Sequence, residues 1–138
     1  MSAVDPEIEE HLTRCADLRR LAYDFKDSFV NRADWSIVLQ FYAALHLADA
    51  YLKMRNPGYA PTSHKDRDDA IWSKDGLTGL PEEARKEYYK LKDLSRQVRY
   101  ESVFHAQPAN FKSARNWLNK VVSVLRPLLQ EEGYDLPH

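Results

Sequence analysis

The stretch Asp34-Trp-Ser-Ile-Val-Leu-Gln-Phe-Tyr-Ala-Ala-Leu-His-Leu-Ala-Asp-Ala-Tyr-Leu-Lys-Met54 decides the fold. Strongly polar side chains are few after its first residue, and apolar or aromatic residues fall on every other sector of a helical wheel. A helix that is hydrophobic nearly all round belongs in the centre of a helical bundle. We expect Asp34 to cap the start of this helix and Asn56-Pro57-Gly58 to end it.

The remaining segments repeat the helical period on one face only. Apolar residues recur at steps of three or four over residues 5–30, from Pro81 to about Tyr100 and over residues 109–132. A short polar segment from His64 to Trp72 lies between the central stretch and the region that begins at Pro81. Short connections place neighbouring helices antiparallel. We therefore expect an all-α protein, an up-down four-helix bundle with one additional short helix and about five helices in all.

Length and composition fit one domain. The chain has 138 residues, of which 43% are hydrophobic, 30% are charged and four are glycine, a balance that favours helices over sheets. No linker or repeat divides it, so we expect a single domain over residues 1–138, with a core at about 5–132 and tails at 1–4 and 133–138. Because the net charge is −1, any site for a polyanion must come from local clustering of basic residues.

The cysteine content, the N-terminus and the acidic residues indicate the compartment and the need for cofactors. Cys15 is the only cysteine, so an intramolecular disulfide is excluded and a reducing cytoplasm is the natural compartment. The acidic N-terminus lacks the basic flank and apolar run of a signal peptide. His46 and Asp49 make membrane insertion of the central stretch costly. We expect a cytoplasmic protein without membrane contact, metal or other cofactor, because the acidic residues form no metal constellation.

The side chains suited to chemistry are histidines, arginines and tyrosines at helix ends or on the central helix. The candidates are His46 with Asp49, His64 with Arg67, Tyr89 with Lys92, Arg96 with Arg99 and Tyr100, and finally His105. Arg85, Tyr89, Lys92, Arg96 and Arg99 recur at steps of four and three and share one helix face. Positive charge interleaved with aromatic rings is typical of surfaces that bind single-stranded RNA.

The order of these residues resembles a known family. The similar residues are Asp34-Trp35, Phe41-Tyr-Ala-Ala-Leu-His46, Asp49-Ala-Tyr-Leu52, Ser63-His64-x-x-Arg67, Tyr89 and Ser95-Arg96-x-x-Arg99-Tyr100. Together they resemble the small single-domain bacterial and archaeal members of the HEPN superfamily, over roughly residues 8–129. The resemblance implies a compact all-α bundle, commonly dimeric. Many members are metal-independent endoribonucleases or toxins paired with nucleotidyltransferase antitoxins, and others are non-catalytic binding modules.

The signature of the nuclease members implies that Arg99 and His105 are catalytic. The run Arg99-Tyr-Glu-Ser-Val-Phe-His105 has the required spacing, with five residues between the pair. Histidine can move the proton of a ribose 2′-OH, and arginine can neutralise charge on the phosphate. Tyr100 departs from the signature, which usually has Asn, Asp or His there. On one continuous helix the pair would point about 120° apart, so they converge only if the helix ends between them or a second subunit supplies one.

Two functions remain open at this point. The first is a homodimeric RNA-acting protein, an endoribonuclease or toxin that cleaves by 2′-OH attack. The second is a non-catalytic module that binds RNA, a nucleotide or a protein partner such as a nucleotidyltransferase antitoxin. In that alternative His46 is a buried histidine held by Asp49 or a backbone carbonyl, as buried polar groups require. His64 and Arg67 then only cap and pair on a surface helix.

Overall fold

The computed structural model describes residues 4–25, 32–101 and 107–137, and its regular elements are all helices. They are α1 (Pro6–Phe25), α2 (Arg32–Arg55), α3 (His64–Ile71), α4 (Glu82–Tyr100) and α5 (Pro108–Glu131), with one turn of 3-10 helix, η1 (Lys74–Gly76). No strand occurs within the described ranges. The expected all-α class with about five helices is confirmed.

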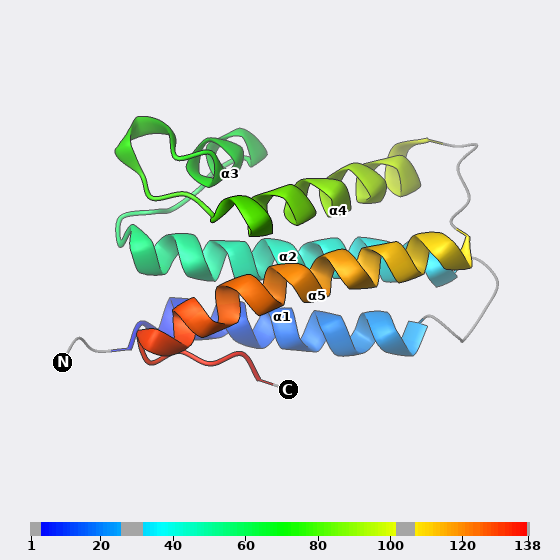
Figure 1. Cartoon of the computed structure of the whole chain (residues 1–138), viewed down its shortest axis with the longest axis horizontal. Helices are drawn as coiled ribbons and strands as arrows, with labels where there is room; N and C mark the ends of the chain where they lie inside the picture. Colours follow the sequence, from blue (N-terminus) through cyan, green and yellow to red (C-terminus); the bar gives the residue numbers. More distant parts are fainter. Residues whose placement is uncertain (1–3, 26–31, 102–106, 138) are drawn as a thin grey trace.

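The four long helices lie alongside one another, and successive ones point in opposite directions (Figure 1). α2 packs against α1, α4 and α5, and α4 also packs against α5. The short α3 lies at one end of the bundle, beside the start of α4. The expected up-down four-helix bundle with one additional short helix is therefore confirmed.

α2 occupies the centre because its surface is apolar nearly all round. Leu47 and Ala48 are completely buried, as are most residues in the middle of this helix. Its first turn differs from expectation in two ways. The helix begins at Arg32, so Asp34 lies in the first turn instead of capping it, where its carboxylate still faces the positive end of the helix dipole. Trp35 is 64% exposed and does not contribute to the core.

The apolar face of α1 follows the predicted stripe. Ile8, Leu12, Cys15 and Ala22 are all buried in the core. Burial also raises the pKa of the Cys15 thiol to about 12, so this cysteine packs as a small hydrophobic side chain. The helix ends at Phe25, and the rest of the expected helix, to residue 30, lies outside the described residues.

The C-terminal segment is part of the core, so the expected tail at 133–138 is wrong for most of its length. Gly133 adopts a positive φ of 89° directly after α5, a conformation that glycine accepts without strain. The chain then turns back, and Tyr134 and Leu136 are buried. The Tyr134 hydroxyl accepts a hydrogen bond of 2.9 Å from the Asp5 amide. Apolar side chains at two alternate positions explain why this segment packs against the bundle.

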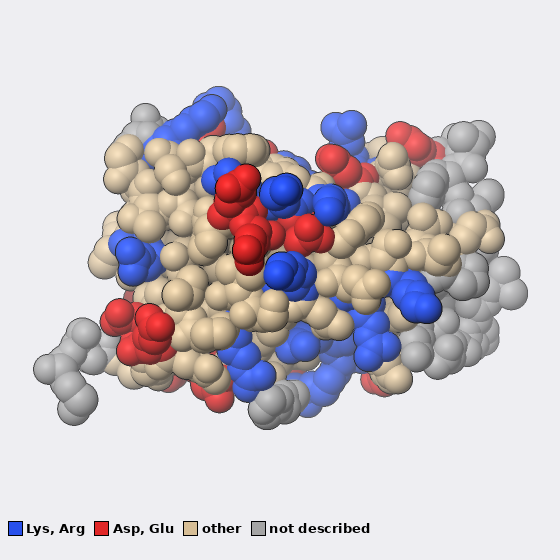
Figure 2. All heavy atoms as spheres, viewed as in Figure 1, with Lys and Arg blue, Asp and Glu red and all other residues tan. Residues whose placement is uncertain are grey.

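Charges of both signs are spread over the surface, in keeping with nearly equal numbers of basic and acidic residues in the sequence. On the face seen in Figure 2, acidic and basic side chains mix over α4 and α5. Basic side chains gather lower on that face, where α5 and α1 lie side by side. Local clustering of basic residues therefore occurs in a chain whose net charge is −1.

Candidate functional site

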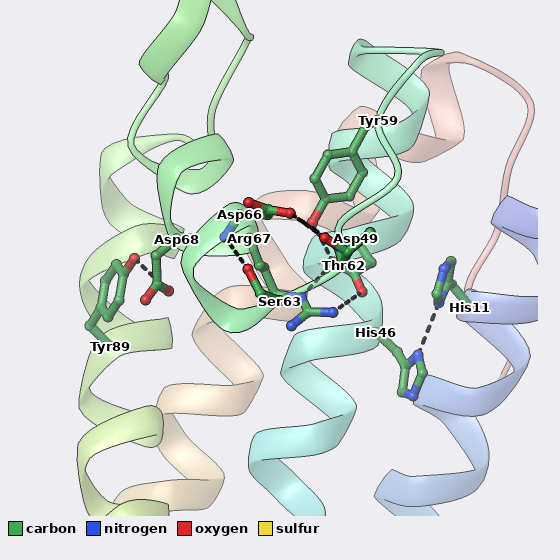
Figure 3. A network of polar contacts seen from close by, with 10 residues as sticks. All are labelled: His11, His46, Asp49, Tyr59, Thr62, Ser63, Asp66, Arg67, Asp68 and Tyr89. Carbon is green, nitrogen blue, oxygen red and sulfur yellow. Dashed lines mark hydrogen bonds and ion pairs between the residues drawn. The ribbon is translucent and has the colours of Figure 1, made fainter.

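Asp49 of α2 is held by an arginine from α3 and a tyrosine from the connection between the two helices (Figure 3). The Arg67 guanidinium donates from Nε to Asp49 Oδ1 at 2.9 Å and from Nη2 to Oδ2 at 3.1 Å. The Tyr59 hydroxyl donates to Oδ1 at 2.8 Å. The side chains of Arg67 and Asp49 are only 15% and 5% exposed. A buried carboxylate with three donors, two of them from one arginine fork, is fully paired.

Contacts within this cluster keep Arg67 charged and Tyr59 neutral. Burial lowers the pKa of Arg67, but the hydrogen bonds and charge of Asp49 outweigh it and raise that pKa overall. Burial, followed by the charge and hydrogen bond of Asp49, raises the pKa of Tyr59. Arg67 therefore stays charged, Tyr59 stays neutral, and neither group is free to move a proton near pH 7. The cluster acts as a structural clamp that holds α3 on α2.

The clamp explains how α3 is stable. This helix has eight residues and is strongly polar, so it would not form alone. Its start is capped, because the Ser63 hydroxyl accepts from the Asp66 amide at 3.1 Å. Ile71 is completely buried, whereas Trp72 stays 50% exposed. Trp72 instead stacks on a tyrosine of α4.

A second set of contacts joins α3 to α4. Asp68 accepts from the Tyr89 hydroxyl at 3.1 Å and from Lys92 Nζ at 2.6 Å. The Trp72 and Tyr89 rings stack with centroids 5.6 Å apart, and the Arg85 guanidinium lies 4.3 Å from the centre of the Trp72 ring. Tyr89 and Lys92, expected to bind a ligand, are thus engaged within the protein. The predicted basic stripe is divided, because its first three residues serve to hold α3.

His46 faces α1, where it meets a histidine that the sequence interpretation missed. Its Nδ1 lies 2.9 Å from Nδ1 of His11, so one ring donates and the other accepts (Figure 3). Burial lowers the pKa of His46, and the neighbouring charges of His11, Arg14 and Arg67 outweigh the opposing effect of Asp49. The expected pairing of His46 with Asp49 is wrong, because their side chains turn toward different helices. The only sequence signal for His11 is its place beside the apolar stripe of α1.

Arg99 lies near the end of α4 and reaches α2. Its Nη1 donates to the Tyr42 hydroxyl at 3.1 Å, and its Nε donates to the Ser95 carbonyl at 3.3 Å. The guanidinium also lies 5.1 Å from the centre of the Tyr100 ring. Among the residues that the structure describes, Arg99 has no carboxylate within ion-pair distance. Within the described part of the chain, its charge is therefore not neutralised by a carboxylate.

Tyr42 and His46 line one hollow between α1 and α2. The hollow has a volume of about 330 Å³, and its other lining residues are Arg14, Asp17 and Leu18. Tyr42 stands four residues before His46, so the two share a helix face. That spacing was the signal that could have found Tyr42 from the sequence. Through Tyr42, Arg99 is connected to this hollow.

The described site residues predicted on α3 and on the last turns of α4 lie in two separate regions. Arg96 and Tyr100 are exposed on the last turns of α4, beside Arg99, and Tyr100 is 73% exposed. His64 is exposed at the start of α3, in the region held by the Asp49 clamp. The expected surface pairing of Arg67 is wrong, because Arg67 pairs with Asp49 in the interior. His105 lies outside the described residues, so its position relative to Arg99 is not part of this geometry.

Comparison with known proteins identifies no relative. No family model matches the chain, and no curated protein or solved structure matches it at a significant level. Within the described ranges, no three His, Cys, Asp or Glu side chains converge as metal ligands would. None of the helices in these ranges combines the length and apolar character needed to cross a membrane. The likeness to the HEPN superfamily therefore rests on the residues quoted from the sequence.

Proposed function

We propose that the protein acts on RNA at the end of α4, as a HEPN-like, metal-independent endoribonuclease. The observation that carries the proposal is the Arg99 guanidinium, which is oriented by Tyr42 and Ser95 and has no carboxylate partner among the described residues. An oriented, uncompensated arginine is suited to a phosphate group. Arg96 adds charge on the same turns of α4, and Tyr100 offers an exposed ring on which a base can stack.

The proposed reaction needs one proton acceptor, one proton donor and charge neutralisation. A histidine takes the proton of the ribose 2′-OH, and the 2′ oxygen attacks phosphorus. The bond from phosphorus to the 5′ oxygen breaks, and the histidinium returns a proton to that leaving oxygen. The products are a 2′,3′-cyclic phosphate and a 5′-hydroxyl end. Arg99 neutralises charge on the phosphate oxygens, and His105 is the proton-transfer group that the motif assigns. His46, whose lowered pKa keeps it neutral near pH 7, can accept a hydrogen bond at the edge of the site.

The test is cleavage of single-stranded RNA in EDTA by the purified protein. We expect wild type to give 2′,3′-cyclic phosphate ends, and Arg99→Ala and His105→Ala to lose about two or more orders of magnitude in rate. Lys86→Ala, which removes an exposed charge elsewhere on α4, is the matched control and should cleave like wild type. If wild type cleaves no faster than the two site variants, the nuclease proposal is wrong.

A non-catalytic interaction module is the second candidate, and a specific feature favours it. Trp35 is 64% exposed and Tyr100 is 73% exposed, and they belong to helix ends that meet at the same end of the bundle (Figure 1). Exposed aromatic side chains are characteristic of interfaces with RNA or protein. The partner in this case is RNA, a nucleotide, a second copy of the chain or a nucleotidyltransferase-type antitoxin.

Binding without cleavage would distinguish this candidate. We expect the intact protein to bind labelled single-stranded RNA in a fluorescence anisotropy titration, and Tyr100→Ala to weaken binding about tenfold if a base stacks there. Light scattering at several concentrations measures whether the chain is a homodimer. RNA binding with no cyclic phosphate product would favour the module over the nuclease.

A further inference from the structure

A second hollow lies on another side of α1 from the one that His46 lines. It is lined by α1, α2 and α5 together with Pro137 of the C-terminal segment, and its volume is about 320 Å³. Its polar lining residues include Arg19, Arg20, Tyr23, Asp24, Gln40 and Arg115. Basic side chains gather on the surface where α1 and α5 lie side by side (Figure 2). The size is in the range of sites for small ligands.

Gln40 lines this hollow and carries a buried acceptor that has no partner. The residue is 3% exposed, and its Oε1 forms no hydrogen bond. The orientation of the amide follows from Ser36. The Ser36 hydroxyl donates to the Ala22 carbonyl at 2.7 Å, so it has no proton left and must accept from Gln40, whose Nε2 lies 3.4 Å away. Oε1 is therefore the atom without a partner, and leaving a buried acceptor unpaired is costly.

Three arginines line the hollow, and Asp24 is the acidic side chain among its described lining residues, so it offsets their positive charge only in part. Arg19 has no ion pair with any residue that the structure describes. Arg115 lies 5.0 Å from the centre of the Tyr23 ring, which positions it without neutralising it. Arg20 pairs with Asp17, but both side chains are more than 60% exposed, so this pair is weak. A ligand with a negative charge meets net attraction here.

We propose that this hollow binds a small organic phosphate that carries hydroxyl or amino groups. The phosphate contacts the arginines, and a hydroxyl or N–H of the same molecule donates to Oε1 of Gln40. The two halves of the site thus recognise two chemical features of one ligand. Inorganic phosphate, which has no carbon-bound hydroxyl or amino group, contacts the arginines without filling the rest of the hollow, and an uncharged polyol satisfies only Gln40. The inference is independent of the proposed action on RNA, because it uses none of the residues at the end of α4.

The experiment is a calorimetric titration of the full chain with glucose 6-phosphate, glycerol 3-phosphate and O-phosphoserine, each compared with inorganic phosphate and with glucose. We expect at least one organic phosphate to bind about tenfold or more tightly than inorganic phosphate, and glucose not to bind measurably. In a nitrogen-15 NMR spectrum, the side-chain amide of Gln40 should shift with the organic phosphate but not with inorganic phosphate.

Matched variants separate the two halves of the site. Arg19→Gln and Arg115→Gln should each weaken binding about tenfold, whereas Lys86→Gln, with the same change of charge on α4, should leave it unchanged. Gln40→Met keeps the size of the side chain and should remove the preference over inorganic phosphate. Circular dichroism of each variant checks that the helices form.

Three results would overturn the inference. Equal affinity for inorganic and organic phosphates would show a charge effect without a specific site. Absence of binding by all three organic phosphates would show that the hollow is not a phosphate site. Displacement of the bound ligand by a short single-stranded RNA in wild type, but not in Arg115→Gln, would assign the hollow to RNA. The cleavage assay in EDTA tests the proposed nuclease separately.

Discussion

Arg67 and Arg99 are both shielded arginines next to a tyrosine, and the structure uses them differently. Arg67 forms a two-bond ion pair with the buried carboxylate of Asp49, to which Tyr59 also donates. Arg99 donates to a hydroxyl and a carbonyl and meets no carboxylate among the described residues. The group that an arginine contacts therefore decides its role. A neutralised arginine holds the fold, whereas one oriented by neutral groups retains its charge for a ligand.

The largest effect that would test this comparison is expected at the clamp. Arg67→Ala leaves the Asp49 carboxylate buried without its counter-charge, so we expect a loss of about 3–5 kcal/mol in the free energy of unfolding. Urea unfolding followed by circular dichroism measures it. Arg20→Ala, which breaks an exposed ion pair with Asp17, is the control and should cost less than about 1 kcal/mol. Equal losses in the two variants would contradict the assignment of Arg67 to the clamp.

A smaller effect on stability is expected at Arg99. Arg99→Gln removes hydrogen bonds to neutral acceptors and leaves no buried charge, so we expect a loss of about 1 kcal/mol in the free energy of unfolding. The same urea titration measures it beside Arg67→Ala. The variant should nevertheless lose RNA binding or cleavage. Destabilisation as large as that of Arg67→Ala would show that Arg99 mainly stabilises the fold, and would contradict its assignment to a ligand site.

The smallest expected effect concerns the pH dependence of stability at His46. Burial and the charge of His11 lower its pKa below the ordinary 6.5, so below that value the unfolded chain binds more protons than the folded one. Stability is therefore full above about pH 7 and falls as the pH drops through 6.5 toward the lowered pKa. His46→Gln should reduce this fall, measured by urea titrations at about pH 7.5 and about pH 5.5. A variant with an unchanged fall would show that protonation of His46 does not cause it.

Much of the fold followed from periodicity, whereas the candidate site followed only in part. The stretch around Leu47 predicts a central helix because its apolar residues cover all sides. The same pattern does not predict whether the Asp49 side chain pairs with His46 or with Arg67, because that depends on how α3 packs against α2. Tyr42 belongs to the quoted run from Phe41 to His46, but the sequence indicates no partner for it, and His11 lies outside the apolar stripe. Neither was therefore predicted as a site residue.

The helices, their alternating directions and the central place of α2 can be predicted from the amino-acid sequence, because helix period and short connections are local properties of the chain. The pairing of polar side chains depends on how the helices pack. Asp49 pairs with Arg67, His46 contacts His11, and Arg99 donates to Tyr42, each time between two different helices. Such contacts depend on the rotation and separation of packed helices, which a linear pattern does not specify. That is why the roles of residues of the same type diverge between the clamp and the end of α4.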